Sequence, residues 1–325
     1  MKIKNKLLIL FLFVIFLNGI GYAQDNFFIS NTNFPVPPYI KRGLVIYYNS
    51  AGYVVREGKR RYVSFEKIMV IQKIEGQKVI GIMYSLNPSS SLLTIESKIL
   101  GQGGSGTFYV HPEYAKKMKG KETFGYKFVT DGKIEYRTEN TSGEIAYDPK
   151  SGVFLSLKVV TNNSEAIDIY KGYEYVNLPP LPNDFPQVAR NSYTYTMSSI
   201  VQGMGTMPVG SISISPISFG KQIAKFRLTT TQTQGLTSTQ EVFGTTLLGP
   251  HYIHPDILKG DITILKLTKK DFNYYIQGEG GQMIAHLIID GTEYSTTYVD
   301  PQTGIVLAQD QQMGDIGILR FILNQ

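Results

Sequence analysis

The 325-residue chain has no cysteine, no tryptophan and only four histidines. Without cysteine there is no disulfide, no thiolate metal site and no lipid anchor on an N-terminal cysteine. Without tryptophan the chain lacks the largest stacking face for a sugar ring, although its 22 tyrosines could serve instead. The residues available for nucleophilic catalysis or for zinc binding are therefore few. We expect a protein that is not an enzyme.

A helical repeat of apolar residues is also missing, because no window of a dozen residues keeps the apolar spacing of a helix. Runs rich in Ile, Val, Tyr and Phe alternate with turn residues instead, which predicts antiparallel sheet. Asp131-Gly132 and Asp290-Gly291 each lie between two such runs, where a hairpin turn is expected. The predicted strands are 44–48, 62–74, 79–86, 92–100, 124–130, 133–137, 153–160, 166–176, 211–215, 223–231, 262–267, 283–289, 292–298, 305–310 and 316–323.

A large net charge is absent too. The chain has 32 basic and 26 acidic residues, and three of the lysines lie within the first six residues. The small remainder does not predict nucleic acid as a partner. The charge is uneven, since residues 41–174 hold 20 basic and 14 acidic side chains and residues 190–320 hold 9 and 10. An anionic partner would dock on the first half. Two basic runs, Lys59-Arg60-Arg61 and Lys116-Lys117-Met118-Lys119, are typical of solvated faces and alternatively form one anionic docking surface.

The N-terminus has the pattern of a secretory signal peptide. Its three lysines precede an apolar run at residues 7–17, and small residues at 21 and 23 precede a cut before Gln24. The apolar run is too short for a membrane span. We expect residues 1–23 to be removed, with an uncleaved anchor as the alternative. The mature protein would be exported to the periplasm or the cell surface, without a lipid anchor or a membrane-spanning segment.

Two motifs occur twice in the same order. Tyr109-Val110-His111-Pro112-Glu113 returns 143 residues later as Tyr252-Ile253-His254-Pro255-Asp256. Asp148-Pro149-Lys150-Ser151-Gly152 returns 152 residues later as Asp300-Pro301-Gln302-Thr303-Gly304. We infer a duplicated fold with β repeats at 41–176 and 190–325. A Pro-rich linker at 177–189 joins the repeats, and an extended Pro-rich segment at 24–40 precedes them.

Both motifs have a composition typical of helix starts and turns. Pro112 and Pro255 suit the first position of a helix, and the acidic residue after each faces the positive end of the helix dipole. Each repeat should therefore contain one short helix. Asp148 and Asp300 suit the first position of a type I turn, which Gly152 and Gly304 would close.

His111 and His254 are the candidates for chemistry. If the repeats met about a pseudo-twofold axis, these histidines could bind a metal with nearby carboxylates of Glu113, Asp256, Asp148 or Asp300, and His251 adds a local pair with His254. We adopt the alternative, in which each histidine precedes a helix start, and so we predict no metal and no cofactor. His111, His254, Tyr109 and Tyr252 are kept as candidate binding residues, with no catalytic residue.

A glycine-rich loop, Gly101–Gly106, matches the spacing G-x-G-x-x-G of a dinucleotide site. A β run and not a helix follows it, so we interpret it as a loop tip. The second half has only Gly249-Pro250 at the corresponding place, which suggests that the loop was added to the first repeat.

These patterns predict a mostly β fold of two tandem repeated antiparallel curved-sheet subdomains, half-barrel-like, each with one short helix. A curved sheet with a helix or loop on its concave side forms an apolar cradle. In general shape alone the chain resembles the half-barrels of periplasmic lipoprotein carriers and sigma-factor regulators. The duplication and the small number of residues suited to catalysis favour an exported, non-catalytic protein that binds an apolar or amphiphilic ligand or an envelope partner. A structural component of the envelope and a metal- or carboxylate-dependent hydrolase are the alternative functions. The alternative fold is a membrane β-barrel, against which the predicted strand at 65–74 carries charges on both faces.

Overall fold

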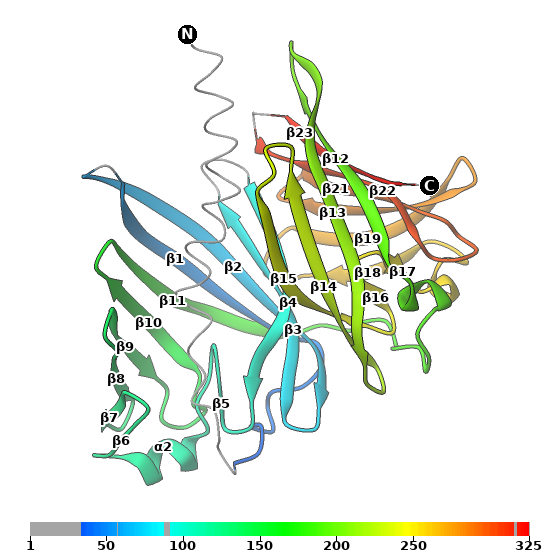
Figure 1. Cartoon of the computed structure of the whole chain (residues 1–325). Coiled ribbons are helices and arrows are strands. Elements are labelled where there is room, and N and C mark those ends of the chain that lie inside the picture. Colours follow the sequence, from blue (N-terminus) through cyan, green and yellow to red (C-terminus); the bar gives the residue numbers. More distant parts are fainter. Residues whose placement is uncertain (1–33, 57, 88–91, 315–316, 325) are drawn as a thin grey trace.

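The computed structural model describes residues 34–56, 58–87, 92–314 and 317–324 (Figure 1). The predicted signal peptide and most of the predicted Pro-rich lead-in lie outside these residues. Within them, no helix has the length and apolar character that crossing a membrane requires. The described chain consists mainly of strands, which confirms the predicted β fold.

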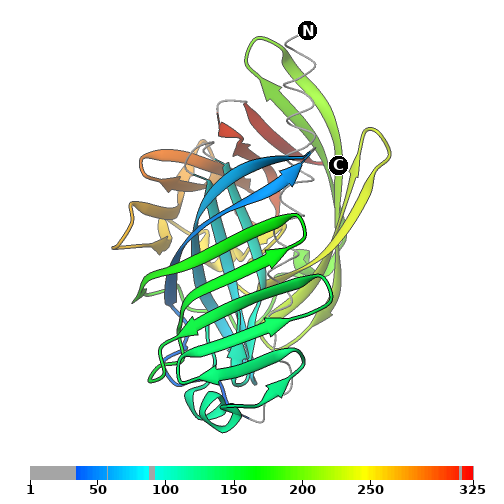
Figure 2. The same ribbon diagram turned by 90° about the vertical axis from the view of Figure 1, so that its left-hand side faces the viewer.

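The strands form two large antiparallel sheets (Figures 1 and 2). The first sheet has eleven strands in the order β5-β4-β3-β2-β1-β11-β10-β9-β8-β7-β6. The second has ten in the order β15-β14-β13-β12-β23-β22-β21-β20-β19-β18, and β16 and β17 pair separately. The first-half strands are β1 Leu44–Arg56, β2 Lys59–Glu75, β3 Lys78–Asn87, β4 Leu92–Gln102, β5 Ser105–Gly106, β6 Glu122–Thr123, β7 Tyr126–Thr130, β8 Lys133–Arg137, β9 Thr141–Tyr147, β10 Phe154–Thr161 and β11 Ser164–Tyr175. Those of the second half are β12 Tyr193–Val201, β13 Gly205–Phe219, β14 Ile223–Gln232, β15 Thr237–Thr245, β16 Leu248–Gly249, β17 Tyr252–Ile253, β18 Ile262–Lys266, β19 Phe272–Glu279, β20 Gln282–Ile289, β21 Thr292–Val299, β22 Val306–Gln312 and β23 Ile318–Leu323.

The two sheets have the same topology. In each, the first strand of the half (β1 or β12) pairs with the second strand on one side and the last strand (β11 or β23) on the other. The correspondence extends to single residues. Ser105 bridges Val110 as Leu248 pairs with Ile253, 143 residues further on. The fold is therefore two tandem repeats of one curved-sheet unit.

The two predicted helices differ in length. In the first half, Pro112 opens the α-helix α2 (Pro112–Met118), whose Ala115 is buried against the first sheet. In the second half, Pro255 opens only a short 3-10 turn, η2 (Pro255–Ile257). The sequence Tyr-Ala-Lys-Lys after the first motif propagates a helix, whereas β-branched Ile257 and the nearby Gly260 do not. A second 3-10 turn, η1 (Gln187–Arg190), lies in the Pro-rich segment between the sheets.

Four strands longer than two residues are absent from the predicted set: β9, β12, β15 and β19. The observed β13 is also much longer than its predicted core at 211–215 and includes Pro208 and Pro216. Both prolines lie at breaks of register with the neighbouring strand. A bulge tolerates proline because no ladder hydrogen bond is lost there.

The two halves pack together through the first sheet. Residues 67–72 of β2 form six consecutive buried positions, so both faces of this strand are covered. One face, with Met69 and Ile71, belongs to the core of the first half, and the other, with Ile68 and Val70, belongs to a cluster shared with the second half. Phe272 of β19 lies in the shared cluster, with its ring centroid 5.0 Å from that of Tyr84 of β3. The junction is thus a continuous apolar core, and the grooves beside it are built on rigid elements.

A candidate binding groove between the two halves

The repeated histidines both cap a helical turn. His111 has φ −63° and ψ 127°, and its Nδ1 accepts the amide of Glu113 at 3.2 Å. His254 has φ −61° and ψ 129°, and its Nδ1 accepts the amide of Asp256 at 3.1 Å. Burial holds the pKa of His254 below its usual range. The geometry supports the helix-start interpretation, because Nδ1 of each histidine accepts a backbone amide as the side chain of an N-cap residue does.

The structure does not bring together the ligand set of the alternative, metal-binding interpretation. Nδ1 of His254 lies 3.7 Å from a carboxylate oxygen of Asp256, within its own motif. The ring of His111 instead packs against Phe34, with centroids 5.4 Å apart. Among the described residues, no three His, Asp or Glu side chains gather closely enough to hold a metal.

Tyr109 and Tyr252 are core residues. Both are fully buried, and their hydroxyls donate to the backbone carbonyls of Gly103 at 2.9 Å and Thr245 at 2.7 Å. Each ring lies against glycines, and a Cβ at Gly106 or Gly249 would collide with it. These two side chains, which the sequence analysis kept as candidate binding residues, therefore have no exposed surface with which to contact a ligand.

The glycine-rich loop is not an addition to the first repeat, so that interpretation was wrong. Residues 101–111 and 244–254 have the same length, and Gly101 and Gly106 correspond to Gly244 and Gly249. The amide of His111 donates to the carbonyl of Gly104, as the amide of His254 does to that of Leu247. Gly101, Gly106 and Gly249 make room for the buried tyrosine ring of their own half.

The two repeated motifs form one structural unit in each half. Asp148 Oδ1 accepts the amide of Lys150 at 3.0 Å, and Asp300 Oδ1 accepts that of Gln302 at 2.7 Å. A hydrogen bond from the Ser151 hydroxyl holds the pKa of Asp148 below its usual range.

Each turn ends in a glycine, Gly152 or Gly304, with φ of 79° or 77°. The carbonyl of that glycine accepts the amide of Val110 or Ile253 at 2.9 Å. Each turn therefore clasps the strand that leads into the His-Pro motif, which explains why the motifs recur together.

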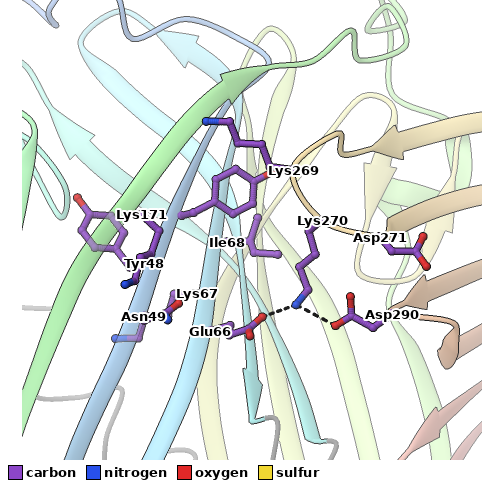
Figure 3. Close-up of a pocket in the computed structure, with 11 residues that line it drawn as sticks. Tyr48, Asn49, Glu66, Lys67, Ile68, Lys171, Lys269, Lys270, Asp271 and Asp290 are labelled. Atoms are coloured by element: carbon purple, nitrogen blue, oxygen red, sulfur yellow. Dashed lines mark hydrogen bonds and ion pairs between the residues drawn. The ribbon is translucent and has the colours of Figure 1, made fainter.

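A groove of about 550 Å³ opens where the two halves meet (Figure 3). Its residues come from three segments of the first half and two of the second. They are Tyr47, Tyr48, Asn49, Glu66, Lys67, Ile68 and Lys171 on one side of the junction, and Lys269, Lys270, Asp271 and Asp290 on the other. Four of the eleven are lysines.

The two ion pairs of Lys270 and the hydrogen bonds of the Glu174 carboxylate fix the geometry of the groove. Lys270 is 14 % exposed and forms ion pairs with Glu66 and with Asp290, the second at 3.0 Å. Burial alone would lower the pKa of Lys270, but these two carboxylates raise it. Glu174 of β11 accepts the amide of Thr268 at 3.1 Å and the Tyr47 hydroxyl. Burial would raise the pKa of Glu174, and these hydrogen bonds outweigh it and hold the pKa below its usual range.

Two lysines of the groove remain available to a ligand. Lys171 is the extra residue of a β-bulge, because β1 pairs Tyr47 with Gly172 and Tyr48 with Tyr170. Lys269 comes from the second half, and its Nζ would lie 3.2 Å from a Cβ built at Gly172. Both side chains are exposed, and neither forms an ion pair with any residue that the structure describes. In Figure 3, Asp271 and Asp290 lie on the side of the groove away from Lys171.

No family model and no curated protein matches the chain. Solved structures that it resembles include a Nostoc punctiforme protein of unknown function from the DUF3598 family, at 9 % identity and TM-score 0.22, covering 90 % of this chain and 95 % of that one. A Bacteroides fragilis protein described as a candidate outer membrane protein has 11 % identity and TM-score 0.17, with 86 % and 96 % covered. A candidate AttH protein from Nitrosomonas europaea has 12 % identity and TM-score 0.18, with 86 % and 92 % covered. Scores this low support no conclusion on function.

The sequence analysis did not find the groove. Lys171 and Lys269 are 98 positions apart, and each looks like an ordinary surface lysine. The remaining histidines lie elsewhere: His251 is fully buried with Nε2 3.1 Å from the carbonyl of Val188, and His286 stacks on Tyr275 of β19. A bulge in one half and a loop in the other place the two lysines in one groove, and no local sequence pattern predicts this arrangement.

Proposed function

We propose that the protein is an exported, non-catalytic binding protein that holds the acidic group of a small amphiphilic ligand in the groove between its halves. The observation that carries this proposal is the pair of unpaired ammonium groups, Lys171 and Lys269, that the two halves contribute to one groove. Ligand sites occur preferentially at domain interfaces, and the groove volume falls in the range typical of small-molecule sites.

The chemistry of the lining favours an anion with an apolar portion. A carboxylate, sulfonate or phosphate between Lys171 and Lys269 would gain charge-assisted hydrogen bonds. The half-buried ring of Tyr47 supplies apolar surface in the groove, whereas the side chain of Ile68 is almost fully buried. The groove is mainly polar, so the ligand's acidic group contributes more to recognition than its apolar portion. This narrows the predicted apolar or amphiphilic ligand to an amphiphilic anion.

The ion pairs beneath the groove make it preorganised. Lys270 is fixed by Glu66 and Asp290, and Lys67 by Asp168, with Nζ 2.9 Å from the carboxylate. A rigid wall loses little conformational entropy when a ligand binds, which favours affinity. The proposal assigns no catalytic residue, since each contact described is a packing, capping or ionic contact.

The proposal is tested by fluorescence titration with anilinonaphthalene sulfonate, an amphiphilic anion, and with phenylnaphthylamine, its uncharged analogue. Removing one charge-assisted hydrogen bond, in Lys171→Met or Lys269→Met, should weaken binding of the sulfonate about tenfold. Lys266→Met, which removes an exposed lysine of β18 outside the groove, is the matched control and should bind as the wild type does. Equal affinity for the sulfonate in the wild type and the Lys171→Met/Lys269→Met variant would refute the proposal.

A further inference from the structure

In the hairpin of β1 and β2, β2 extends well beyond its pairing with β3, and β1 extends two residues beyond its pairing with β11 (Figure 1). β1 pairs with β11 as far as Val54, and β2 pairs with β3 only from Glu66 onward. The part of β2 from Lys59 to Phe65 therefore has β1 as its sole strand neighbour within the described chain. Because β1 still pairs with β11 beside most of this stretch, β2 forms an edge of the sheet here, and the hairpin is two-stranded only where Val55 and Arg56 pair with Arg60 and Lys59.

The tip of this hairpin combines aromatic and cationic side chains. Lys59, Arg60, Arg61 and Tyr62 are all exposed, and Tyr62 at 76 % is the most exposed large apolar or aromatic residue that the structure describes. Tyr62 pairs across the ladder with Tyr53, at 6.1 Å between ring centroids. The guanidinium of Arg60 lies 4.5 Å from the centre of the Tyr53 ring.

Glu165 of β11, a described acidic residue next to this group, forms an ion pair with Lys158 at 2.8 Å and also attracts Arg60. Residues 56–62 contain four basic residues and one acidic residue, so the tip keeps a net positive charge.

The second half shows that the fold does not require this chemistry. Its corresponding hairpin, between β12 and β13, also projects, since β13 pairs with β14 only from Gly210 onward. Residues 198–207 at that tip contain no charged and no aromatic side chain. The same supersecondary element thus forms without basic or aromatic residues. Because folding does not require them on the first hairpin, a binding role is the explanation that we pursue.

We propose that the β1–β2 hairpin tip docks on an anionic lipid surface. Tyrosine favours the interface between headgroups and acyl chains, and each basic residue near an anionic bilayer adds attraction. A specific protein complex buries roughly 800 Å² of complementary surface per partner. A fluid bilayer needs no such complementary surface. Charge and aromatic content therefore fit lipid better than a folded acidic protein or a nucleic acid.

The other basic run lies elsewhere, so the two do not form one docking surface. Lys116 and Lys117 belong to α2, which lies at the opposite end of the first sheet from the hairpin tip in both views (Figures 1 and 2). Lys119, just after α2, forms an ion pair with Asp131 at 2.7 Å. This separation supplies a control with the same change of charge.

The test uses a label at the tip itself. Because the full chain has no cysteine, Ser64→Cys introduces one thiol for an environment-sensitive dye, on the exposed side of β2 near Tyr62. Addition of vesicles of phosphatidylglycerol and phosphatidylcholine should shift the dye emission to the blue, and pure phosphatidylcholine should not. Arg60→Glu/Arg61→Glu should raise the lipid concentration at half-shift by at least about thirtyfold. Lys116→Glu/Lys117→Glu should leave that concentration within about threefold of the parent's.

Several results would overturn the proposal. One is a shift that Arg60→Glu/Arg61→Glu leaves intact, and another is an equal loss in Lys116→Glu/Lys117→Glu, which would mean that net charge alone acts. A shift with DNA or an acidic protein but not with vesicles would assign the tip to a different polyanion. Circular dichroism melting of each variant confirms that a loss of binding does not reflect unfolding. Tyr62→Ser, which keeps the charges, should weaken binding by a smaller factor than the double charge reversal.

Discussion

His111 and His254 make the same hydrogen bond in the two halves, each accepting the amide two residues ahead, at 3.2 and 3.1 Å. In both halves the strand before the histidine is clasped by a turn that begins with aspartate and ends with a left-handed glycine. The recurrence of these residues therefore records a repeated structural joint. A histidine pair shared between the repeats is not needed to explain this recurrence. The candidate binding site lies instead at the junction between the halves.

The turn at Asp300 should act on stability and not on ligand binding. Its carboxylate accepts the amides of Gln302 and Thr303 at 2.7 and 3.2 Å. Asp300→Ala removes both hydrogen bonds and should lower the free energy of unfolding by about 0.5–2 kcal/mol, as measured by urea denaturation. Asp271→Ala, which removes an exposed carboxylate without an ion pair among the described residues, should change it by less than about 0.5 kcal/mol. Lost binding of the sulfonate probe with unchanged unfolding would make Asp300 a ligand contact instead.

The glycine that closes the same turn should be more sensitive still. Gly304 has φ 77°, and a Cβ there would collide with the carbonyl oxygen of Ile253. Gly304→Ala combines backbone strain with a steric clash and should lower the free energy of unfolding by about 2–4 kcal/mol. Gly291→Ala is the matched control, since φ there is 73° but nothing lies within 4 Å of the added Cβ. Equal losses in the two variants would show that the clasp on Ile253 is not rigid.

His251 should make the protein lose stability in acid. Burial lowers its pKa from 6.5 to about 4, so the unfolded chain takes up the proton first as the pH falls. The stability present above about pH 6.5 is lost as the pH falls toward 4, to a total of about 3 kcal/mol.

Phe108 occupies the place of His251 in the first half, 143 residues earlier, and is also fully buried. His251→Phe should cost about 1 kcal/mol at neutral pH, because the Val188 carbonyl loses its partner. Near pH 4 the variant should become the more stable protein. Urea unfolding of both proteins at the two pH values checks this, and a difference that does not change with pH would contradict it.

The sequence predicted the parts of the fold that local chemistry decides. Pro112, Pro255 and the two aspartate turns lie where their composition places them, and Asp290-Gly291 forms a hairpin with both residues at positive φ, 50° and 73°. Strands such as β15, made of Thr, Ser, Gln and Glu at its exposed end, were missed because they show no apolar alternation. Their pairing in the sheet, and not their own side chains, holds them extended.

The candidate groove depends on tertiary structure that no local pattern contains. The bulge opposite Tyr47 and Tyr48 sets the position of Lys171, and the packing of Phe272 against Tyr84 places the Lys269 loop beside it. Neither lysine differs from a surface lysine in its sequence neighbourhood. Sites of this kind are found only after the two halves are seen together.

One groove, shared by the two halves, is proposed to bind an amphiphilic anion. Acetylation of lysines with and without bound anilinonaphthalene sulfonate, followed by mass spectrometry, tests it most directly because both groove lysines are exposed. We expect the bound probe to protect Lys171 and Lys269 together from acetylation and to leave Lys266 as reactive as it is without the probe. Protection of neither groove lysine at saturating probe, or protection confined to lysines of one half away from the junction, would contradict it.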